Sequence, residues 1–515
     1  MEKAINTGAG PELFLALVAA TGTDLDRVQT ELIAALENVR YKAHPIKLSS
    51  LLSELQGYRD QLRASPADQY IESRMTQGNE LRRNTLRNDA LAILAVAEIR
   101  KIRRDFESKD GASQNQHAYI FRSLKHPDEL ETLRRIYGPA FFAIAAYAPH
   151  DARRDALAQR IAASYGETQS SKYFSEAERL MLRDMEEASL PYGQNVRRTY
   201  HRADVFVDTT SREVMASSLN RFVELIFGNT LQTPTRSEYA MFHAKASALR
   251  SAELGRQVGA AISRPNGDIV AVGTNEVPRF GGGLYWCDDK PDMREFVLGY
   301  DSNDRNKKNL IADTLMRLQK AGWLTPDKLD LDCERLVAEA SEGEKPLFPA
   351  ESAIGSVIEY GRAVHAEMAA IVDAARRGVS IADCIMFTTT FPCHLCARHI
   401  VAAGIKKLIY IEPYPKSLAA ELYPDSIKVE GSLDCAAQVV FEPFVGVAPI
   451  QYMRLFEASN RKNKDGLARL FDASLAVLRY RASERLYLED EDFLLTEFDK
   501  NLKGQTSLFG GGRNG

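Results

Sequence analysis

The sequence predicts an α/β protein with more than one domain. Strand-like and helix-like stretches alternate through the first 210 residues, and a second alternating series begins near residue 236. Such an alternation favours a mostly parallel sheet covered by helices on both faces. The chain has 515 residues, which is too many for one ordinary hydrophobic core.

The strands of the first half are short apolar runs bounded by turn-forming residues. The run ELFLALVAA (12–20) predicts a buried strand, and the turn TGTD (21–24) follows it. The next segment, LDRVQTELIAALENV (25–39), has apolar residues at helical spacing and predicts an amphipathic helix. Further strands are predicted at 41–49, 118–124, 140–148 and 203–208.

The second half predicts a helix, a hairpin and a further strand–helix series. Two strand-like runs flank the turn RPNGD (264–268), which predicts a β-hairpin. Residues 279–350 are polar and irregular, and they predict an insertion with a helix near 309–323. The remaining predicted elements are helices at 238–251 and 417–426 and strands at 384–390, 406–414 and 438–447.

These patterns predict an order of domains along the chain. The first α/β domain is followed by a helical connector and by the second α/β domain, and a charged helical extension ends in the tail FGGGRNG. We therefore expect domains at 1–210 and 236–455, a connector at 211–235, the insertion at about 279–350, and the extension with a disordered tail at 456–515.

Composition limits the classes of function. The chain is 45% hydrophobic and 26% charged, with a formal net charge of -4, which is typical of a soluble globular protein. That balance argues against a protein built mainly to coat nucleic acid, although a local basic groove stays open. Six cysteines make no disulfide framework, and the apolar runs are too short for a bilayer. We expect a cytoplasmic protein with no membrane contact.

The stretch FPCHLCARHI (391–400) places Cys393 and Cys396 three positions apart after a proline. A C-x-x-C pair can be a redox pair, half of a structural zinc site or half of a catalytic metal site. A redox pair leaves the upstream VHAEM (364–368) without a role. A structural zinc needs a fourth ligand, and we expect His394 and His399 of the same helix to face elsewhere.

A catalytic zinc site accounts for both motifs. His365 and the two cysteines supply three ligands, and three protein ligands leave a fourth position for water. Glu367 lies two residues from the ligand histidine, where it can move protons rather than bind metal. This H-x-E…P-C-x-x-C signature is typical of zinc-dependent nucleobase deaminases.

From about residue 236 to 450 the chain resembles the cytidine/deoxycytidylate deaminase superfamily, on these motifs and on RQVGAAI (256–262) and AVGTNEVP (271–278). The resemblance implies a cytidine-deaminase-like α/β/α domain that hydrolyses the C–N bond of a cyclic amidine. It also implies that Arg256 contacts substrate phosphate, that Asn275 contacts the sugar or base, and that the Ala366 amide binds the cytosine carbonyl. Glu276 departs from the usual glycine, and solvent-exposed arginine and turn asparagine are the alternative interpretations of Arg256 and Asn275.

The N-terminal domain resembles a degenerate P-loop nucleotide kinase. In LVAATGTDLDRV (17–28) only Gly22 and Thr23 of the G-x-x-x-x-G-K-[ST] motif survive, Asp24 follows them, and the lysine is missing. We expect no kinase activity but a regulatory domain, with weak nucleotide binding by Gly22, Thr23 and Asp24 at the helix start. Asp24 is equally well placed as a helix cap. The basic stretch LRRNTLRND (81–89) has two interpretations, as a surface that contacts phosphate or RNA and as a solvated helix face.

The whole chain resembles the bacterial anti-phage dCTP/dCMP deaminases, on GTNEVP, GGGLYW, VHAEM and YIEPYPKSLA. The resemblance implies conversion of dCTP or dCMP to dUTP or dUMP, which drains the dCTP pool that a phage needs. It also implies a homo-oligomer that an inhibitory small RNA or a phage-derived signal controls. The alternatives are a cytosine deaminase acting on single-stranded nucleic acid and a housekeeping dCMP deaminase that supplies dUMP.

Overall fold

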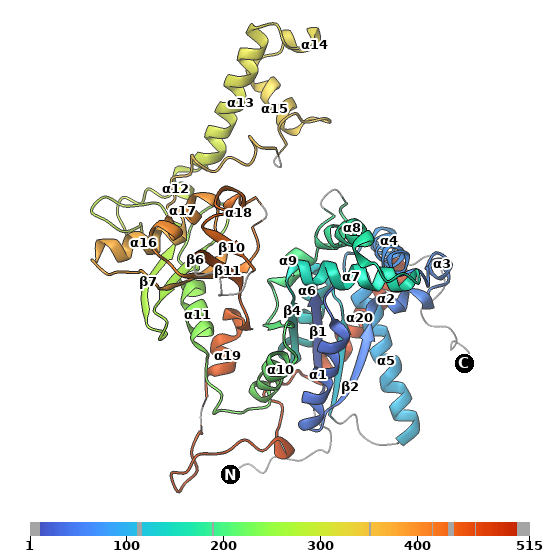
Figure 1. Cartoon of the computed structure of the whole chain (residues 1–515). Helices are drawn as coiled ribbons and strands as arrows, with labels where there is room; N and C mark the ends of the chain where they lie inside the picture. The colour runs from blue at the N-terminus through green and yellow to red at the C-terminus, as the bar shows by residue number, and fades with distance from the viewer. Residues whose placement is uncertain are drawn as a thin grey trace. The chain divides into compact units, whose positions relative to one another are not determined.

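The computed structural model describes residues 11–110, 116–187, 190–349, 352–414, 416–430, 437–458 and 460–501 (Figure 1). The expected tail FGGGRNG lies outside the described residues. Residue contacts divide the chain into two compact units, which are residues 1–238 together with 445–515 (unit 1) and residues 239–444 (unit 2). Each unit contains a six-stranded sheet with helices around it, so the predicted α/β class is confirmed.

The sheet of unit 1 has the strand order β12-β5-β4-β1-β3-β2. Strands β1 to β5 are parallel, and the two-residue strand β12 pairs antiparallel with β5. Every residue of β1 is buried, because a central parallel strand is covered on both faces. The strands are Leu13–Ala19 (β1), Lys42–Lys47 (β2), His117–Arg122 (β3), Phe141–Tyr147 (β4), Val205–Asp208 (β5) and Gly446–Val447 (β12).

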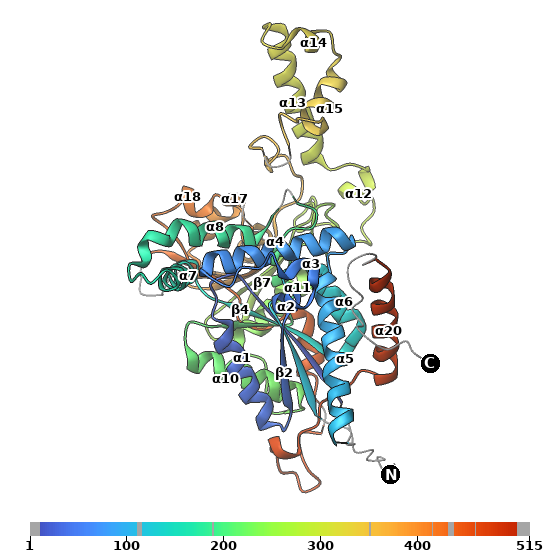
Figure 2. The same ribbon diagram turned by 90° about the vertical axis from the view of Figure 1, so that its right-hand side faces the viewer.

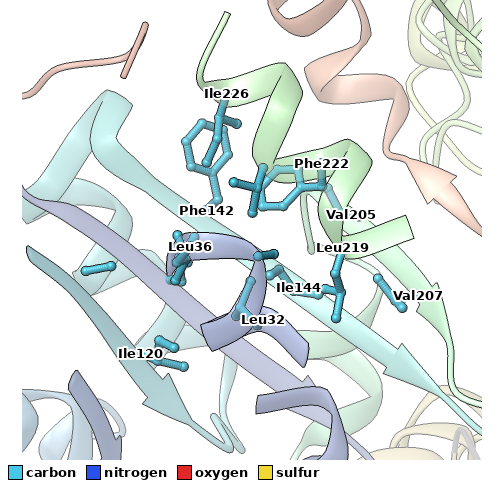
Figure 3. Close-up of a cluster of buried hydrophobic side chains, with 14 of the residues drawn as sticks. Leu32, Leu36, Ile120, Phe142, Ile144, Val205, Val207, Leu219, Phe222 and Ile226 are labelled. Atoms are coloured by element: carbon cyan, nitrogen blue, oxygen red, sulfur yellow. The ribbon is translucent and has the colours of Figure 1, made fainter. Parts of the chain in front are cut away.

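Helices cover both faces of this sheet, as Figure 2 shows with α1 and α10 on one side and α5, α6 and α20 on the other. The segment expected as a connector contains α10, whose apolar side chains join α1 in one core over the sheet (Figure 3). The helices of unit 1 are Leu25–Asn38 (α1), Leu48–Leu51 (α2), Gln56–Arg59 (α3), Ala67–Thr85 (α4), Ala90–Asp110 (α5), Pro127–Tyr137 (α6), His150–Ser164 (α7), Phe174–Met185 (α8), Val196–Tyr200 (α9), Arg212–Ile226 (α10), Tyr452–Phe456 (α19) and Glu484–Asn501 (α20).

A buried ion cluster fixes the C-terminal helix α20 to this unit. Arg103 of α5 donates hydrogen bonds of 2.7 Å to both Glu12, before β1, and Glu491 of α20. Tyr137 and Tyr487 donate to the same two carboxylates at 2.9 Å. The polar groups of the cluster therefore satisfy one another away from water, and α20 belongs to the fold of unit 1.

The basic stretch 81–89 is not a solvated face throughout. The Arg82 side chain is fully buried and pairs with Glu129 at 2.8 Å. Arg87 pairs with Asp89 at the same distance. These arginines hold α4, α5 and α6 together, which a sequence pattern of basic residues does not reveal.

The sheet of unit 2 has the order β10-β11-β9-β8-β6-β7. Strands β6 and β7 form the predicted antiparallel hairpin, β6 is antiparallel to β8, and the other pairs are parallel. Helices α16 and α17 share one core with one face of the sheet, and α11 packs against Gly259 on the other face. The elements are Arg236–Ala248 (α11), Gly259–Ser263 (β6), Ile269–Thr274 (β7), Ala366–Arg376 (α16), Ile385–Thr390 (β8), His394–Ala402 (α17), Lys407–Glu412 (β9), Ala419–Leu422 (α18), Ile427–Val429 (β10) and Val439–Pro443 (β11).

The single strand predicted at 438–447 is wrong. It is two strands, β11 in unit 2 and β12 in unit 1, separated at Phe444 and Val445. The buried carboxylate of Glu238 accepts a 2.8 Å hydrogen bond from the Val447 amide, which fixes the second strand. An apolar run alone does not show that its two halves join different sheets.

The insertion is helical, with Glu295–Leu298 (α12), Ser302–Lys320 (α13), Pro326–Leu329 (α14) and Cys333–Glu342 (α15). Ile311, Leu315 and Leu336 form a small apolar core of its own. Within the described part of the chain, no helix combines the length and the apolar character that crossing a membrane requires.

We expect the substitution Arg103→Leu to lower the free energy of unfolding by about 3–5 kcal/mol, because it leaves Glu12 and Glu491 as buried carboxylates without their cation. Urea unfolding followed by circular dichroism measures the effect. The matched control is Arg100→Leu on the same helix, whose partner Asp492 is exposed, with an expected loss below about 1 kcal/mol. Equal losses for the two variants would contradict the structural role of the buried cluster.

Candidate active site

The two predicted motifs meet where two helices of unit 2 begin. His365 is the N-cap of α16, and Cys393 is the N-cap of α17, which begins directly after β8 and Pro392. Cys396 lies in the first turn of α17, so both cysteines face the same side. The positive ends of both helix dipoles therefore point at the same place, which favours thiolate ligands.

The three side chains fit a metal ion. Nδ1 of His365 lies 3.2 Å from Sγ of Cys393 and 3.4 Å from Sγ of Cys396. Tetrahedral zinc, with Zn–S distances of about 2.3 Å and Zn–N distances of about 2.0 Å, requires N···S separations of about 3.5 Å. Both cysteines are buried, and a hydrogen bond from Cys396 together with His365 lowers the pKa of the Cys393 thiol to about 4. The group supplies two sulfur donors and one imidazole, which are ligand types that zinc prefers.

The histidines of α17 do not complete a closed four-ligand site. Among the described residues, the group around His365 contains only the two cysteines as further ligands. His394 instead lies 3.9 Å from Glu359. The geometry leaves one metal position for a non-protein ligand, as the catalytic interpretation predicts and the structural one does not.

Glu367 lies in the first turn of α16, and only 4% of it is exposed. Burial raises the pKa of its carboxyl group to about 7, and the negative charge of Cys393 acts in the same direction. A carboxyl group with that pKa can both accept and donate a proton near neutral pH.

Gly273 of β7 sets the distance between this helix and the sheet. A Cβ atom at residue 273 would lie 2.1 Å from the Ala366 carbonyl oxygen and 2.5 Å from the Ala370 amide nitrogen. The backbone of α16 therefore lies directly on the strand. Ala366, the first residue of α16, is fully buried, and its amide has no partner within the helix.

A cavity of about 190 Å³ lies beside the metal ligands and Glu367. Arg256 lines it and is half exposed, with its guanidinium 3.2 Å from Glu412 and 5.6 Å from the centre of the Tyr414 ring. The sequence did not identify four apolar or hydroxyl side chains of the cavity wall. Phe391 could have been found from its place beside Pro392 in the cysteine motif. The four are Val258, Ile358, Thr390 and Phe391.

Asn275 lines the same cavity but uses its amide group within the protein. Its Oδ1 accepts a 2.7 Å hydrogen bond from the Val258 amide, and its Nδ2 donates one of 2.7 Å to the Arg256 carbonyl. Asn275 therefore fixes the backbone that carries Arg256. The neighbouring Glu276 is buried and accepts from the amides of Ala252 and Val277.

The three N-terminal candidates lie in unit 1, between β1 and α1. Gly22 forms the turn, with a positive φ of 94°. The Thr23 amide donates to the Ala20 carbonyl at 3.2 Å. Asp24 caps α1 by accepting from the Arg27 amide at 3.1 Å.

A metal-binding His–Cys–Cys group beside a buried carboxylate, on a three-layer α/β unit, defines a metal-dependent hydrolytic site. The family model of the cytidine and deoxycytidylate deaminase zinc-binding region matches residues 234–412. The deoxycytidylate deaminase of Enterobacteria phage T2 is 32% identical over 161 residues, which are 31% of this chain and 71% of that protein. The deoxycytidylate deaminase of Enterobacteria phage T4 is 50% identical over 54 residues, which are 10% of this chain and 28% of that protein.

Among solved structures, the dCMP deaminase of cyanophage S-TIM5 in complex with dCMP and dUMP is 19% identical and has a TM-score of 0.22. The alignment covers 41% of this chain and 98% of that one. On the sequence matches, the chain belongs to the cytidine and deoxycytidylate deaminase family. It is a hydrolytic deaminase whose cofactor is zinc, as predicted from its motifs.

We expect Gly273→Ala to reduce both bound zinc and deaminase activity, because the added methyl group forces α16 away from β7. Overpacking of this kind costs about 1–3 kcal/mol. Zinc per chain, measured by mass spectrometry of the purified protein, and the initial rate test it. The control is Gly361→Ala, where the nearest atom to the new Cβ lies at 3.8 Å. Full zinc occupancy and full activity in both variants would contradict the role of Gly273.

Proposed function

We propose that this chain deaminates free deoxycytidine nucleotides, converting dCMP, dCTP or both to the corresponding deoxyuridine nucleotides. The observation that carries the proposal is the buried Glu367 beside the His365, Cys393 and Cys396 group, in a cavity that also holds an exposed arginine. The T2 relative, named a deoxycytidylate deaminase, supports the monophosphate as one substrate.

The reaction replaces the amino group at C4 of cytosine by oxygen from water and releases ammonia. Zinc held by the three ligands would lower the pKa of water from near 16 towards about 7. Glu367 takes a proton from the water and gives it to N3 of the ring. When the hydroxyl has added to C4, the same carboxylate takes the remaining hydroxyl proton and passes it to the C4 amine. The C4–N bond then breaks, ammonia leaves and the C4 carbonyl forms. One carboxyl group with a pKa near neutrality serves both transfers in turn.

Substrate binding uses the residues around the cavity. The amide of Ala366, which has no partner within α16, donates to the cytosine carbonyl. Arg256 supplies the positive charge for the substrate phosphate, and its surface ion pair with Glu412 is weak enough to be exchanged for it. Asn275 contributes by holding the backbone of Arg256, in addition to lining the cavity.

The wider role that we propose is depletion of dCTP during phage infection. Its support is the resemblance of the whole chain to anti-phage deaminases and the presence of unit 1 beside the deaminase unit. The proposal includes a homo-oligomer and control by a small RNA or a phage-derived signal. A fall of the dCTP pool in infected cells that carry the active chain, and not in cells that carry Glu367→Gln, is the expected result.

Mass-resolved product analysis tests the reaction. Zinc-loaded protein is mixed separately with dCMP, dCTP, CTP and single-stranded DNA. We expect uracil products from the free deoxynucleotides only. Glu367→Gln should keep its zinc and lose about 10²–10⁴-fold in rate, because the proton carrier is removed. Uracil formed only in the DNA would support nucleic-acid editing instead, and full activity of Glu367→Gln would contradict the mechanism.

Replacement of the cavity arginine tests phosphate recognition. We expect Arg256→Gln to lower kcat/KM for the preferred nucleotide by about 10- to 100-fold, which corresponds to one charge-assisted hydrogen bond. The nucleoside deoxycytidine, which has no phosphate, should be affected little. Steady-state kinetics with both substrates gives the comparison, and equal losses with both would assign Arg256 a structural role.

A further inference from the structure

We propose that unit 1 contains a second ligand site, a cavity that binds a nucleoside phosphate through side-chain cations. The cavity has a volume of about 390 Å³, within the usual range for small-molecule sites. It lies outside the carboxyl ends of the parallel strands β1, β2 and β3, where ligands of open α/β sheets bind. The proposal is independent of the reaction in unit 2.

The loop after β1 does not offer an open cradle of amides to phosphate. The Thr21 amide donates to the Asp184 carboxylate at 2.7 Å, and the Thr23 amide donates to the Ala20 carbonyl. In a working P-loop such amides surround the phosphates. Anion binding in this cavity must therefore come mainly from side chains.

Three cationic side chains gather around one tyrosine in the cavity wall. Lys47 donates a 2.9 Å hydrogen bond to the hydroxyl of Tyr70. The guanidinium groups of Arg74 and Arg160 lie 3.5 Å and 5.8 Å from the centre of the same ring. Burial alone would raise the pKa of the Tyr70 hydroxyl, but the Lys47 hydrogen bond and the three charges lower it. Like charges this close repel, and a bound anion would relieve the repulsion.

The charges of Lys47 and Arg160 help to lower the pKa of Asp26, but the nearby carboxylates form their ion pairs with other residues. Asp26 is paired with Arg122 at 2.5 Å, and Asp24 is paired with Arg27. Within the described residues, no carboxylate lies at ion-pair distance from Lys47, Arg74 or Arg160.

Two other cations that line the cavity are already neutralised by buried partners. Lys125 is paired with Asp184 at 2.9 Å, and Arg82 is paired with Glu129. Lys47, Arg74 and Arg160 differ in having no carboxylate partner within the described residues, although Nη1 of Arg74 donates to the Arg63 and Tyr70 carbonyls.

The other side chains of the cavity wall indicate what the ligand contains besides phosphate. Thr23 Oγ1 and Arg74 Nε are buried and have no hydrogen-bond partner within the described residues, so both can contact a bound group. Apolar side chains lie beside the cations and give an organic ring a surface to contact, which inorganic phosphate would not use. These side chains are Leu48, Ile71, Met75, Leu91 and Leu157. Arginine binds phosphate with paired hydrogen bonds, so the cavity fits a phosphate with a nucleoside attached.

Calorimetric titration of the full chain tests the site with nucleotides that contain no cytosine. The probes are AMP, ATP, GTP, dTMP, adenosine and inorganic phosphate. We expect at least one nucleotide to bind more tightly than inorganic phosphate and adenosine. The double variant Arg74→Gln/Arg160→Gln should weaken that binding by about tenfold or more. The variant Arg256→Gln, in unit 2, should bind the same nucleotide as the unchanged chain does.

The matched control is Arg83→Gln/Arg154→Gln, which removes two charges from the same helices, α4 and α7, outside the cavity wall. Thermal unfolding of both double variants shows whether each is folded. Equal weakening in the two double variants would overturn the proposal, as would binding that only Arg256→Gln abolishes. No binding of any nucleotide at millimolar concentration by the folded full chain would also overturn it, whether or not the deaminase is active.

Discussion

The deaminase site depends on how closely helices approach the β6–β7 hairpin. Gly273 lets the backbone of α16 lie on β7, and Gly259 does the same for α11 on the opposite side, where a Cβ atom would lie 1.9 Å from the Ala244 carbonyl oxygen. Protein interiors are packed at crystal-like density, and the nearest atoms at both positions are helix backbone. A side chain at either position must therefore displace a whole helix, because no flexible side chain is there to move aside. The start of α16 carries His365, Ala366 and Glu367 in succession, so its position fixes all three together. These are the residues that we propose as a metal ligand, a substrate-facing amide and a proton carrier.

Burial then determines the chemistry of these groups. The two helix starts bring partial positive charge to the cysteines, which suits thiolates, while the same enclosed space makes an unpaired carboxylate costly. The hydrogen bonds from Cys396 and His365 lower the pKa of the Cys393 thiol despite its burial, whereas burial raises the pKa of the Glu367 carboxyl group. A thiol with a lowered pKa suits the binding of a cation, and a carboxyl group with a raised pKa suits the transfer of a proton, so the site needs both pKa shifts. One arrangement of two helices and one strand end supplies them.

The sequence was sufficient for the α/β class and for the grouping of His365, Cys393 and Cys396, because both follow from local spacing. Cys393 and Cys396 are separated by one helical turn, and His365 stands just before an Ala-rich helix. The role of Asn275 could not be read in the same way, since its partners Val258 and Arg256 lie 17 and 19 positions away and are backbone groups. The sequence also did not predict the burial of Arg82 or the division of 438–447 between two sheets, for a related reason. Burial and sheet membership depend on segments distant in the chain.

We propose that unit 1 is a degenerate P-loop domain that lacks the catalytic loop of a working one and keeps a basis for phosphate recognition. A working P-loop combines free amides, a lysine at the helix start and a hydroxyl for Mg²⁺, and phosphoryl transfer needs all of them aligned on one phosphate chain. Here the loop amides bond within the protein, and Asp24 caps the helix. Within the described residues, the cavity cations that have no carboxylate at ion-pair distance lie on α4, on α7 and at the end of β2. Such an arrangement can neutralise a phosphate without placing it for transfer, so we expect recognition rather than kinase chemistry from this unit.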